Sequence, residues 1–282
     1  MTATSFTSIL HPTDFSAASE LAFAHALKLA LLTRAHFDVV HTEHPDRETI
    51  DWAAFPGVRS TLERWGLLAP GSQPAAVAEQ LGMRVRKVDV VGRDPVDGVV
   101  RFINEHPCDL LVLATHGRAG WQRWRKGSIA EPIARRAHTP SLFLPHAARG
   151  FVDPETGDVA LRRILIAVDH DPRPEPAVTE AWRLARALDA DSVGLYALYV
   201  GTAADAPALR AMPEVGARVE PMARPGAVVE RIVETASVLD VDLIVMATRG
   251  HEGVLDALRG STTEQVLHRA GRALLAVPAA AA

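Results

Sequence analysis

The sequence predicts an α/β protein made of two tandem doubly wound domains, each built around a five-stranded parallel sheet. Three observations support this fold class. The chain has 282 residues, enough for two domains at about 100–200 residues each. Its second half repeats the pattern of its first. Short apolar runs of strand length alternate with amphipathic helical patterns, as expected for a parallel sheet that is covered on both faces.

The repeat is visible as two sets of matching segments. Residues 9–14 are echoed by residues 164–169 at an offset of 155, and residues 109–117 by residues 242–250 at an offset of 133. Gly127-Ser128 matches Gly260-Ser261 at the second offset. The offset falls from 155 to 133 between the two sets. The first copy therefore carries about 22 extra residues in its middle, which we place within residues 47–80.

Hydrophobic periodicity predicts the elements in chain order. In the first copy we expect strands at 8–13, 36–42, 84–91, 110–115 and 141–144, helices at 17–33, 95–105 and 128–137, and helical pieces in the extra segment. In the second copy we expect strands at 163–168, 193–200, 218–222, 243–248 and 273–277, with helices at 177–188, 227–238 and 262–270. Apolar residues at i, i+4 and i+7 define the first helix of each copy: Phe23, Leu27 and Ala30, then Val178, Trp182 and Ala185.

Glycine and proline mark the boundary between the copies. Gly150, Pro154 and Gly157 lie close together where the repeat pattern stops, as in a linker. We therefore expect one domain over residues 1–148, a linker over 149–159 and a second domain over 160–282. Three prolines follow Asp169, at Pro172, Pro174 and Pro176. They are expected to delay the first helix of the second copy.

Composition excludes several classes of protein. The net charge is −4 and no long block of one sign occurs, which argues against duplex nucleic acid as the main partner. Cys108 is the single cysteine, so no disulfide and no cysteine-based zinc site can form within one chain, and a reducing cytoplasm fits best. The longest apolar runs are strand-sized and residues 1–10 lack the features of a signal peptide, so we expect no membrane association.

The candidate site follows from strand ends. In an open parallel sheet, ligands bind beyond the carboxyl ends of the strands, where Asp14 and Asp169 close the first strand of each copy. Gly127-Ser128 and Gly260-Ser261 precede helices and can offer backbone N–H groups and a hydroxyl to an anion. A structural alternative stays open, because Ser128 with Glu131, and Ser261 with Glu264, also have capping-box spacing.

These residues carry a family resemblance. The sequence Ile-Leu-His-Pro-Thr-Asp-Phe-Ser at 9–16, followed by Gly117, nine residues and Gly127-Ser128, resembles the universal stress protein family, and the second half repeats the pattern. The resemblance covers essentially the whole chain. It implies Rossmann-like domains of the adenine nucleotide alpha hydrolase-like (HUP) class, paired through their last strands as a pseudo-dimer. Dimerisation of whole chains stays open.

The resemblance also implies a function. It predicts a stress-response module that binds ATP without dedicated catalysis, with Mg²⁺ only as the ion that accompanies the nucleotide; it assigns no catalytic residue and no separate metal site. The first site would use Pro12, Thr13, Asp14, Thr42, Leu113, Ala114, Gly117, Gly127, Ser128 and Ile129. The second would use Ala167, Val168, Asp169, Val200, Met246, Ala247, Gly250, Gly260, Ser261 and Thr262.

Two features of the loops bear on ligand binding, and the second of them distinguishes the two sites. Ala114 and Ala247 replace the first glycine of the family's loop motif, and an added methyl is harmless only where φ is negative and no close backbone approach is needed. The segment between Gly117 and Gly127 holds four basic residues and no acidic one, whereas that between Gly250 and Gly260 holds both signs. A polyphosphate is therefore expected to prefer the first half on Coulomb grounds.

Other functions remain as alternatives. A nucleotide-independent interaction scaffold would explain the two alanines, and a nucleotide-hydrolysing or adenylylating enzyme would depend on Asp14 or Asp169. His41, Glu43, His44 and Asp46 are metal ligands by type, although a solvated loop explains them more simply.

Overall fold

The computed structural model describes residues 5–43, 52, 57–115, 129–146, 148–190, 192–209, 218–249 and 261–279. The first half contains β1 (Ser8–Pro12), α1 (Ala17–Thr33), β2 (His36–Glu43), α2 (Val58–Arg64), α3 (Ala76–Leu81), β3 (Arg84–Val91), α4 (Pro95–Glu105), β4 (Leu110–Thr115), α5 (Ala130–Ala137) and β5 (Ser141–Pro145). The second contains β6 (Arg163–Val168), α6 (Glu175–Ala187), β7 (Gly194–Tyr199), the 3₁₀ turn η4 (Ala203–Asp205), β8 (Val219–Ala223), α7 (Val228–Val238), β9 (Leu243–Arg249), α8 (Thr262–Ala270) and β10 (Ala273–Ala279).

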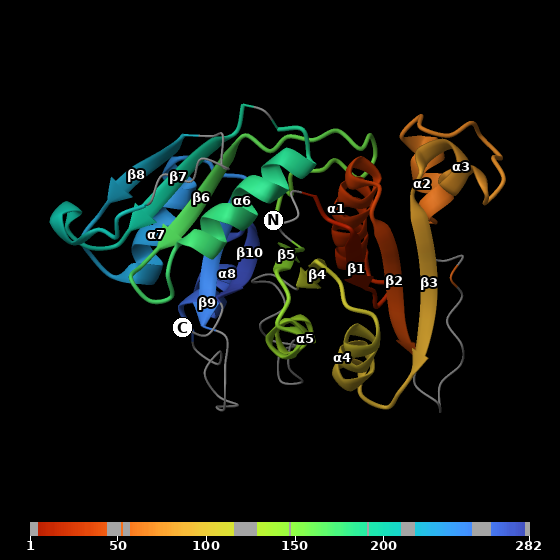
Figure 1. The fold of residues 1–282 in the computed structure, drawn as a ribbon, viewed down its shortest axis with the longest axis horizontal. Helices are drawn as coiled ribbons and strands as arrows, with labels where there is room; N and C mark the ends of the chain where they lie inside the picture. Colours follow the sequence, from red (N-terminus) through yellow and green to blue (C-terminus); the bar gives the residue numbers. More distant parts are fainter. Residues whose placement is uncertain are drawn as a thin grey trace.

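All ten strands join one sheet in the order β3-β2-β1-β4-β5-β10-β9-β6-β7-β8 (Figure 1). Each half contributes five parallel strands, and the halves meet where β5 and β10 pair antiparallel, with Phe143 opposite Leu274 and Ser141 opposite Ala276. This arrangement confirms the predicted α/β class, the tandem five-stranded domains and their pairing through the last strands.

Helices cover both faces of the sheet. On one face α1 packs on β1, β4 and β5, and α6 packs on β9 and β10; on the other, α4 contacts α5 and α7 contacts α8. Alternate residues of a buried strand enter opposite layers: Ile9 of β1 belongs to the cluster under α1 and α6, and Leu10 to the cluster under α4, α5, α7 and α8. Helix α8 contacts both β10 and β5, so it bridges the junction between the halves.

Most predicted boundaries agree with the structure to within one or two residues. Helix α6 begins two residues early, at Glu175 rather than Ala177, with Pro176 in its first turn. Proline is tolerated there since the first helical N–H groups have no intrahelical acceptor. The start still falls three residues after the position equivalent to Ala17, so the prolines delay the helix less than expected. Helix α5 begins at Ala130, and Ser128 lies outside the described residues.

The extra segment of the first copy lies between β2 and β3. That connection runs from residue 44 to 83, whereas its counterpart between β7 and β8 runs from 200 to 218. Helices α2 and α3 occupy the difference, in agreement with the helical pieces expected there. Leu62 and Met83 are fully buried in the cluster under α1, so the insertion extends the first half's core.

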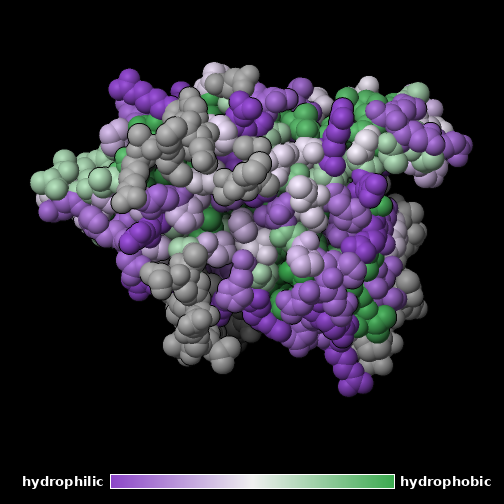
Figure 2. Space-filling model, in the orientation of Figure 1, coloured by the Kyte–Doolittle hydropathy of each residue, from purple (hydrophilic) through white to green (hydrophobic). Residues whose placement is uncertain are grey.

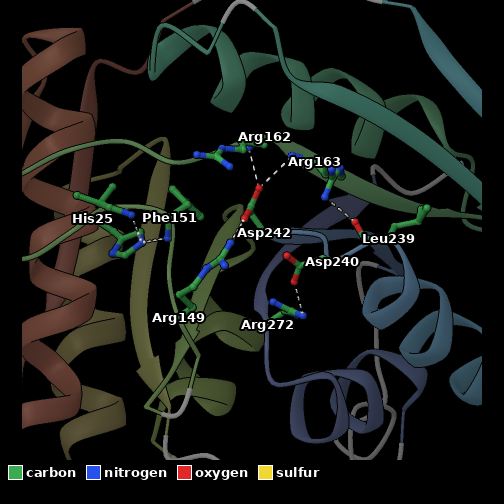
Figure 3. A network of polar contacts seen from close by, with 10 residues as sticks. His25, Arg149, Phe151, Arg162, Arg163, Leu239, Asp240, Asp242 and Arg272 are labelled. Carbon is green, nitrogen blue, oxygen red and sulfur yellow. Dashed lines mark hydrogen bonds and ion pairs between the residues drawn. The ribbon is translucent and has the colours of Figure 1, made fainter.

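The segment between the halves packs closely against the first half. His25 of α1 donates a hydrogen bond from Nδ1 to the Leu21 carbonyl, and its Nε2 accepts the N–H groups of Phe151 and Val152 at 2.9 and 3.1 Å (Figure 3). Gly150 has φ +67°, and a Cβ there would lie 2.7 Å from the His25 ring. Trp65 donates its indole N–H to the Pro154 carbonyl. The connection is therefore part of the core rather than a free tether.

Two equivalent aspartates anchor the first strand of each half. Asp242 accepts the backbone N–H groups of Arg162 and Arg163 and the guanidinium of Arg149 (Figure 3). Asp109, at the matching position, accepts the N–H groups of Thr7 and Ser8 and lies 3.8 Å from Arg183 of the second half. A carboxylate that accepts several N–H groups forms hydrogen bonds stronger than those between neutral groups. These aspartates thus fix how each half meets its neighbouring segment.

Hydrophilic residues cover most of the face seen in Figure 2, and hydrophobic residues occur there in small patches. Among the described residues, none of the helices combines the length and apolar character that crossing a bilayer would require.

Burial makes two histidines sensitive to acid. Desolvation lowers the pKa of His25 and of His11 from 6.5 to about 4 in each case. Since unfolding returns these groups to their ordinary pKa, their contribution is complete above pH 6.5 and is lost as pH falls toward 4. Each histidine should therefore reduce the free energy of unfolding by roughly 2 kcal/mol between pH 7 and pH 5.

Chemical denaturation across this pH range tests the prediction on His25→Gln. The variant should be less stable at pH 7 and should show a shallower pH dependence than the parent, because one titrating group is gone. His146→Gln serves as the control, since His146 is exposed, and should keep the parental slope. An unchanged slope in His25→Gln would contradict the role of this buried imidazole.

Candidate functional site

The first candidate site is a pocket of about 130 Å³ at the carboxyl ends of β1, β2 and β4. Its wall includes seven of the ten residues expected for the first site: Pro12, Thr13, Asp14, Thr42, Leu113, Ala114 and Ile129. Gly117, Gly127 and Ser128 lie outside the described residues. The pocket thus brings together residues from three strands and from the approach to α5.

A chain of polar groups runs from beneath the floor of this pocket, at His11, to its lining at Ser19 and Thr13. His11 donates from Nδ1 to the Val112 carbonyl at 2.9 Å, and its Nε2 lies 3.2 Å from Ser19 Oγ. Ser19 Oγ lies 3.0 Å from Thr13 Oγ1, which also accepts the N–H of Phe15. All three side chains are buried. The chain links the sheet interior to the wall at Thr13 and fixes the orientation of both hydroxyls.

Asp14 shapes the mouth of the pocket. Its Oδ1 accepts the N–H and hydroxyl of Ser16, which in turn caps α1 by accepting the N–H of Ser19. Phe15 is held at φ +60° between them, in a region that non-glycine residues rarely occupy. A positive φ at a pocket mouth is the kind of strain that local hydrogen bonds must maintain.

His41 of β2 belongs to the pocket wall. Its Nδ1 donates to the Thr13 carbonyl at 2.9 Å, and its ring centroid lies 4.5 Å from that of Phe15. The expectation of a solvated loop is therefore wrong for His41, which is buried near the end of the strand. Strand β2 runs through Glu43, and His44 and Asp46 lie outside the described residues.

The second candidate site is the equivalent pocket of the second half, with a volume of about 430 Å³. Its wall includes Ala167, Val168, Asp169, Val200, Met246, Ala247, Ser261 and Thr262. Gly250 and Gly260 lie outside the described residues. Ser261 is the N-cap of α8, and its hydroxyl accepts the N–H of Glu264 at 3.2 Å. The capping alternative thus holds for Ser261, which also lines the pocket.

The two alanines of the loop motif have relaxed backbones. Ala114 lies in β4 and Ala247 in β9, and neither is among the described residues with positive φ. The methyl groups are therefore compatible with the local conformation. Both line their pockets, so each methyl takes some of the volume next to a ligand.

The repeat gives the two pockets different chemistry. His11, Thr13 and Ser19 correspond to Ile166, Val168 and Pro174 at the offset of 155, so the second pocket lacks an equivalent polar chain at those positions. The strand registers make Tyr199 the counterpart of His41. The ring pair of Phe15 and His41 becomes His170 and Tyr199, at 5.8 Å. Both halves therefore have a contact between two rings at this point, although the residue types differ.

An ion pair adds charge to the second pocket. Arg249 at the end of β9 lies 2.9 Å from Asp171, and both line the pocket. Sequence reasoning assigned no role to either residue, nor to His11 or Ser19, and considered His41 only as a metal ligand by type. Their positions within three residues of strand ends, or on the first helical turn, were the available signal. Which of these side chains turn inward depends on the strand register, which composition and spacing do not determine.

Comparison with known proteins identifies relatives for both halves. The model of the universal stress protein family matches residues 5–145 and 202–278. Universal stress protein MJ0531 of Methanocaldococcus jannaschii is 26% identical over 145 residues, covering 48% of this chain and 80% of that protein.

Solved structures give a similar picture. The crystal structure of a universal stress protein from Archaeoglobus fulgidus covers 96% of this chain and 98% of its own, with a TM-score of 0.66 at 18% identity, which is evidence for the fold. A universal stress protein in complex with cAMP covers 49% of this chain and 97% of its own, with 24% identity and a TM-score of 0.32. The cAMP in that structure is a ligand of that protein.

The ion pair of the second pocket generates a prediction. Asp171 and Arg249 are 73% and 66% exposed, so their contact contributes no more than about 1 kcal/mol to stability. Asp171→Asn should therefore leave the melting temperature nearly unchanged, yet it releases the Arg249 guanidinium toward the pocket. We expect this variant to bind inorganic tripolyphosphate several-fold more tightly than the parent by isothermal titration calorimetry.

The double variant Asp171→Asn with Arg249→Gln should lose this gain, because the freed cation is absent. Asp189→Asn, an equal change of charge at an exposed position beyond α6, is the matched control. An equal gain in Asp189→Asn would assign the effect to net charge rather than to the pocket.

Proposed function

The chain belongs to the universal stress protein family, and from this premise we propose that it is an adenine-nucleotide-binding module of the stress response without dedicated catalysis. ATP is the proposed ligand, with Mg²⁺ entering only as its counter-ion. The main support is that most of the expected residues line two pockets at the carboxyl ends of parallel strands. Ligands usually bind at this position in such sheets.

The proposed roles follow from position in the first pocket. Asp14 and Thr13 orient the adenosine, and Thr42 closes the pocket at the end of β2. Leu113 and Ala114 form the apolar wall beside the ribose. Gly117, Gly127 and Ser128, with the first turn of α5, receive the phosphates, since a helix N-terminus favours anions.

We further propose that the first half is the preferred site. The basic sequence 118–126 supports this choice, as does the polar chain of His11, Ser19 and Thr13, which lets the pocket select hydrogen-bonding ligands. The volume of the pockets is an argument for the alternative. The second pocket is larger, at about 430 Å³ against 130 Å³, and this favours nucleotide binding in the second half instead. Matched variants can distinguish the two arrangements.

The same chemistry supports a non-catalytic role. His11 is close to Ser19, as in a base and nucleophile pair, but burial lowers its pKa to about 4, and so weak a base removes protons poorly near neutral pH. Burial raises the pKa of the Cys108 thiol to about 12, which keeps it protonated and unreactive. We also propose a cytoplasmic location. The proposed domains comprise residues 1–148 and 160–282, with a linker at 149–159.

Chain dimerisation would need a surface other than the last strands. Strands β5 and β10 already pair with each other within the chain, so a homodimer must form through another face of the molecule.

Equilibrium dialysis with labelled ATP tests the proposal on matched variants. Ala114→Leu places a larger side chain in the first pocket, and Ala247→Leu makes the same change at the equivalent position of the second. We expect Ala114→Leu to weaken ATP binding at least about tenfold, since the wall would meet the ligand, and Ala247→Leu to retain the parental affinity. Ser128→Ala should weaken binding by a smaller factor.

The reverse pattern would transfer the preferred site to the second half. Failure of the parent to bind ATP at millimolar concentration would overturn nucleotide binding altogether and leave the interaction scaffold as the function. Phosphate release that depends on Asp14, measured on the same samples, would instead indicate an enzyme.

A further inference from the structure

A third cleft lies where the two halves meet, outside both candidate nucleotide pockets. It has a volume of about 60 Å³ and is lined by α5 and β5 of the first half and by α8, β10 and the end of β9 of the second. Helix α8 contacts β5 across the junction. Residues of both halves therefore face one another in this cleft, which the proposed function does not use.

Three ligand-type side chains converge at the cleft. Glu131 comes from α5, and Glu264 and His268 lie four residues apart on α8, a spacing that puts both on one face of a helix. His268 Nε2 lies 3.3 Å from Glu131 Oε1 and 4.0 Å from Glu264 Oε1. One ligand atom from each residue lies within 4.8 Å of the others.

The burial of these groups is a second, separate observation. The side chains of Glu131, Glu264 and His268 are 14%, 19% and 20% exposed. The Oε1 atom of Glu131 is shielded from solvent, and its contact with His268 Nε2, at 3.3 Å, is long for a hydrogen bond to a carboxylate. A carboxylate oxygen held in this way is costly unless a cation compensates it.

The repeat shows how the cluster arose. Glu131 and Glu264 are equivalent residues at the offset of 133, and His268 is the equivalent of Arg135. At this position the first half keeps a permanent cation, whereas the second half has an imidazole that can exchange its proton for a metal. The two halves therefore contribute equivalent carboxylates to the cleft, Glu131 and Glu264, but different basic residues at the next equivalent position, Arg135 and His268.

We propose that Glu131, Glu264 and His268 form a zinc site that bridges the two halves. Zinc takes imidazole nitrogen and carboxylate oxygen at about 2.0–2.2 Å, which in a tetrahedral site separates neighbouring ligand atoms by about 3.3 Å. The contact of His268 with Glu131 already has this spacing, and Glu264, whose ligand atom lies within 4.8 Å of the other two, needs a shift of no more than about 1.5 Å.

The donor set selects among metals. Imidazole together with carboxylates suits zinc, whereas magnesium prefers all-oxygen octahedral surroundings and retains several waters. Arg135 lines the same cleft and opposes any cation bound there. Replacing this guanidinium with a neutral side chain should therefore tighten zinc binding, an effect that a purely structural cluster would not produce.

Zinc competes with a proton at His268. The Glu131 carboxylate, followed by that of Glu264, raises the pKa of His268 above its ordinary value. The other charged or titratable groups of the cleft are Arg135 and His138 of α5 and its cap, and Arg249 at the end of β9. Binding then releases a proton from His268 Nε2, so zinc affinity falls as pH drops below this raised pKa.

Calorimetric titration of the full chain with zinc tests the proposal. We expect one bound zinc per chain, at least a tenfold loss of affinity in Glu131→Gln, Glu264→Gln and His268→Gln, and tighter binding in Arg135→Gln. His146→Gln, at an exposed histidine outside the cleft, should bind as the parent does. Magnesium should not compete at equal concentration. Titrations in two buffers of different ionisation enthalpy should reveal the released proton.

Two results would overturn the proposal. Equal zinc binding by the parent and the three ligand variants would indicate only an adventitious surface ion. No zinc binding by the parent, combined with a pH-dependent stability that His268→Gln abolishes, would indicate an ion pair across the junction instead. Thermal melts without zinc identify any variant that fails to fold. The zinc assay needs no nucleotide, so its outcome is independent of the proposed function.

Discussion

The antiparallel pairing of β5 with β10 is the interaction on which the rest of the structure depends. Without it each five-stranded sheet would end in an exposed edge of unpaired N–H and C=O groups, a known site of unwanted association. Paired, the apolar residues on both strands are buried: Leu142 and Leu144 on β5, Leu274 and Leu275 on β10. The pairing also brings α5 next to α8, which creates the cleft between the halves.

The connection between the halves reinforces this geometry through polar contacts. Arg149 reaches Asp242 of the second half, while Phe151 and Val152 donate to His25 of the first. One short segment thus holds both halves. The His25 imidazole must be neutral to accept two N–H groups, and burial, which lowers its pKa to about 4, keeps it neutral near pH 7.

The sequence was sufficient to predict the fold, which follows from periodicity and from the repeat, and the family resemblance supplied many of the residues that line the two pockets. Strand ends at Asp14 and Asp169 could be placed by counting alone. It was not sufficient for the contacts between distant segments. His268 and Glu131 are far apart in sequence and meet only because β5 pairs with β10, and the buried side of His41 depends on strand register. The start of α6 was missed because proline is tolerated in a first turn but not deeper in a helix.

Divergence between the copies explains why one fold carries unequal sites. Asp109 and Asp242 keep one role in both halves, because each accepts backbone N–H groups at the start of the first strand of its half. A position on a pocket wall is free to change, and there His11, Thr13 and Ser19 are matched by Ile166, Val168 and Pro174. The second half therefore lacks those two hydroxyls and that imidazole at the equivalent positions, while Asp171 and Arg249 place a pair of opposite charges among the residues that line its pocket. The duplicated scaffold thus preserves what holds the sheet together and differs where a ligand would be chosen.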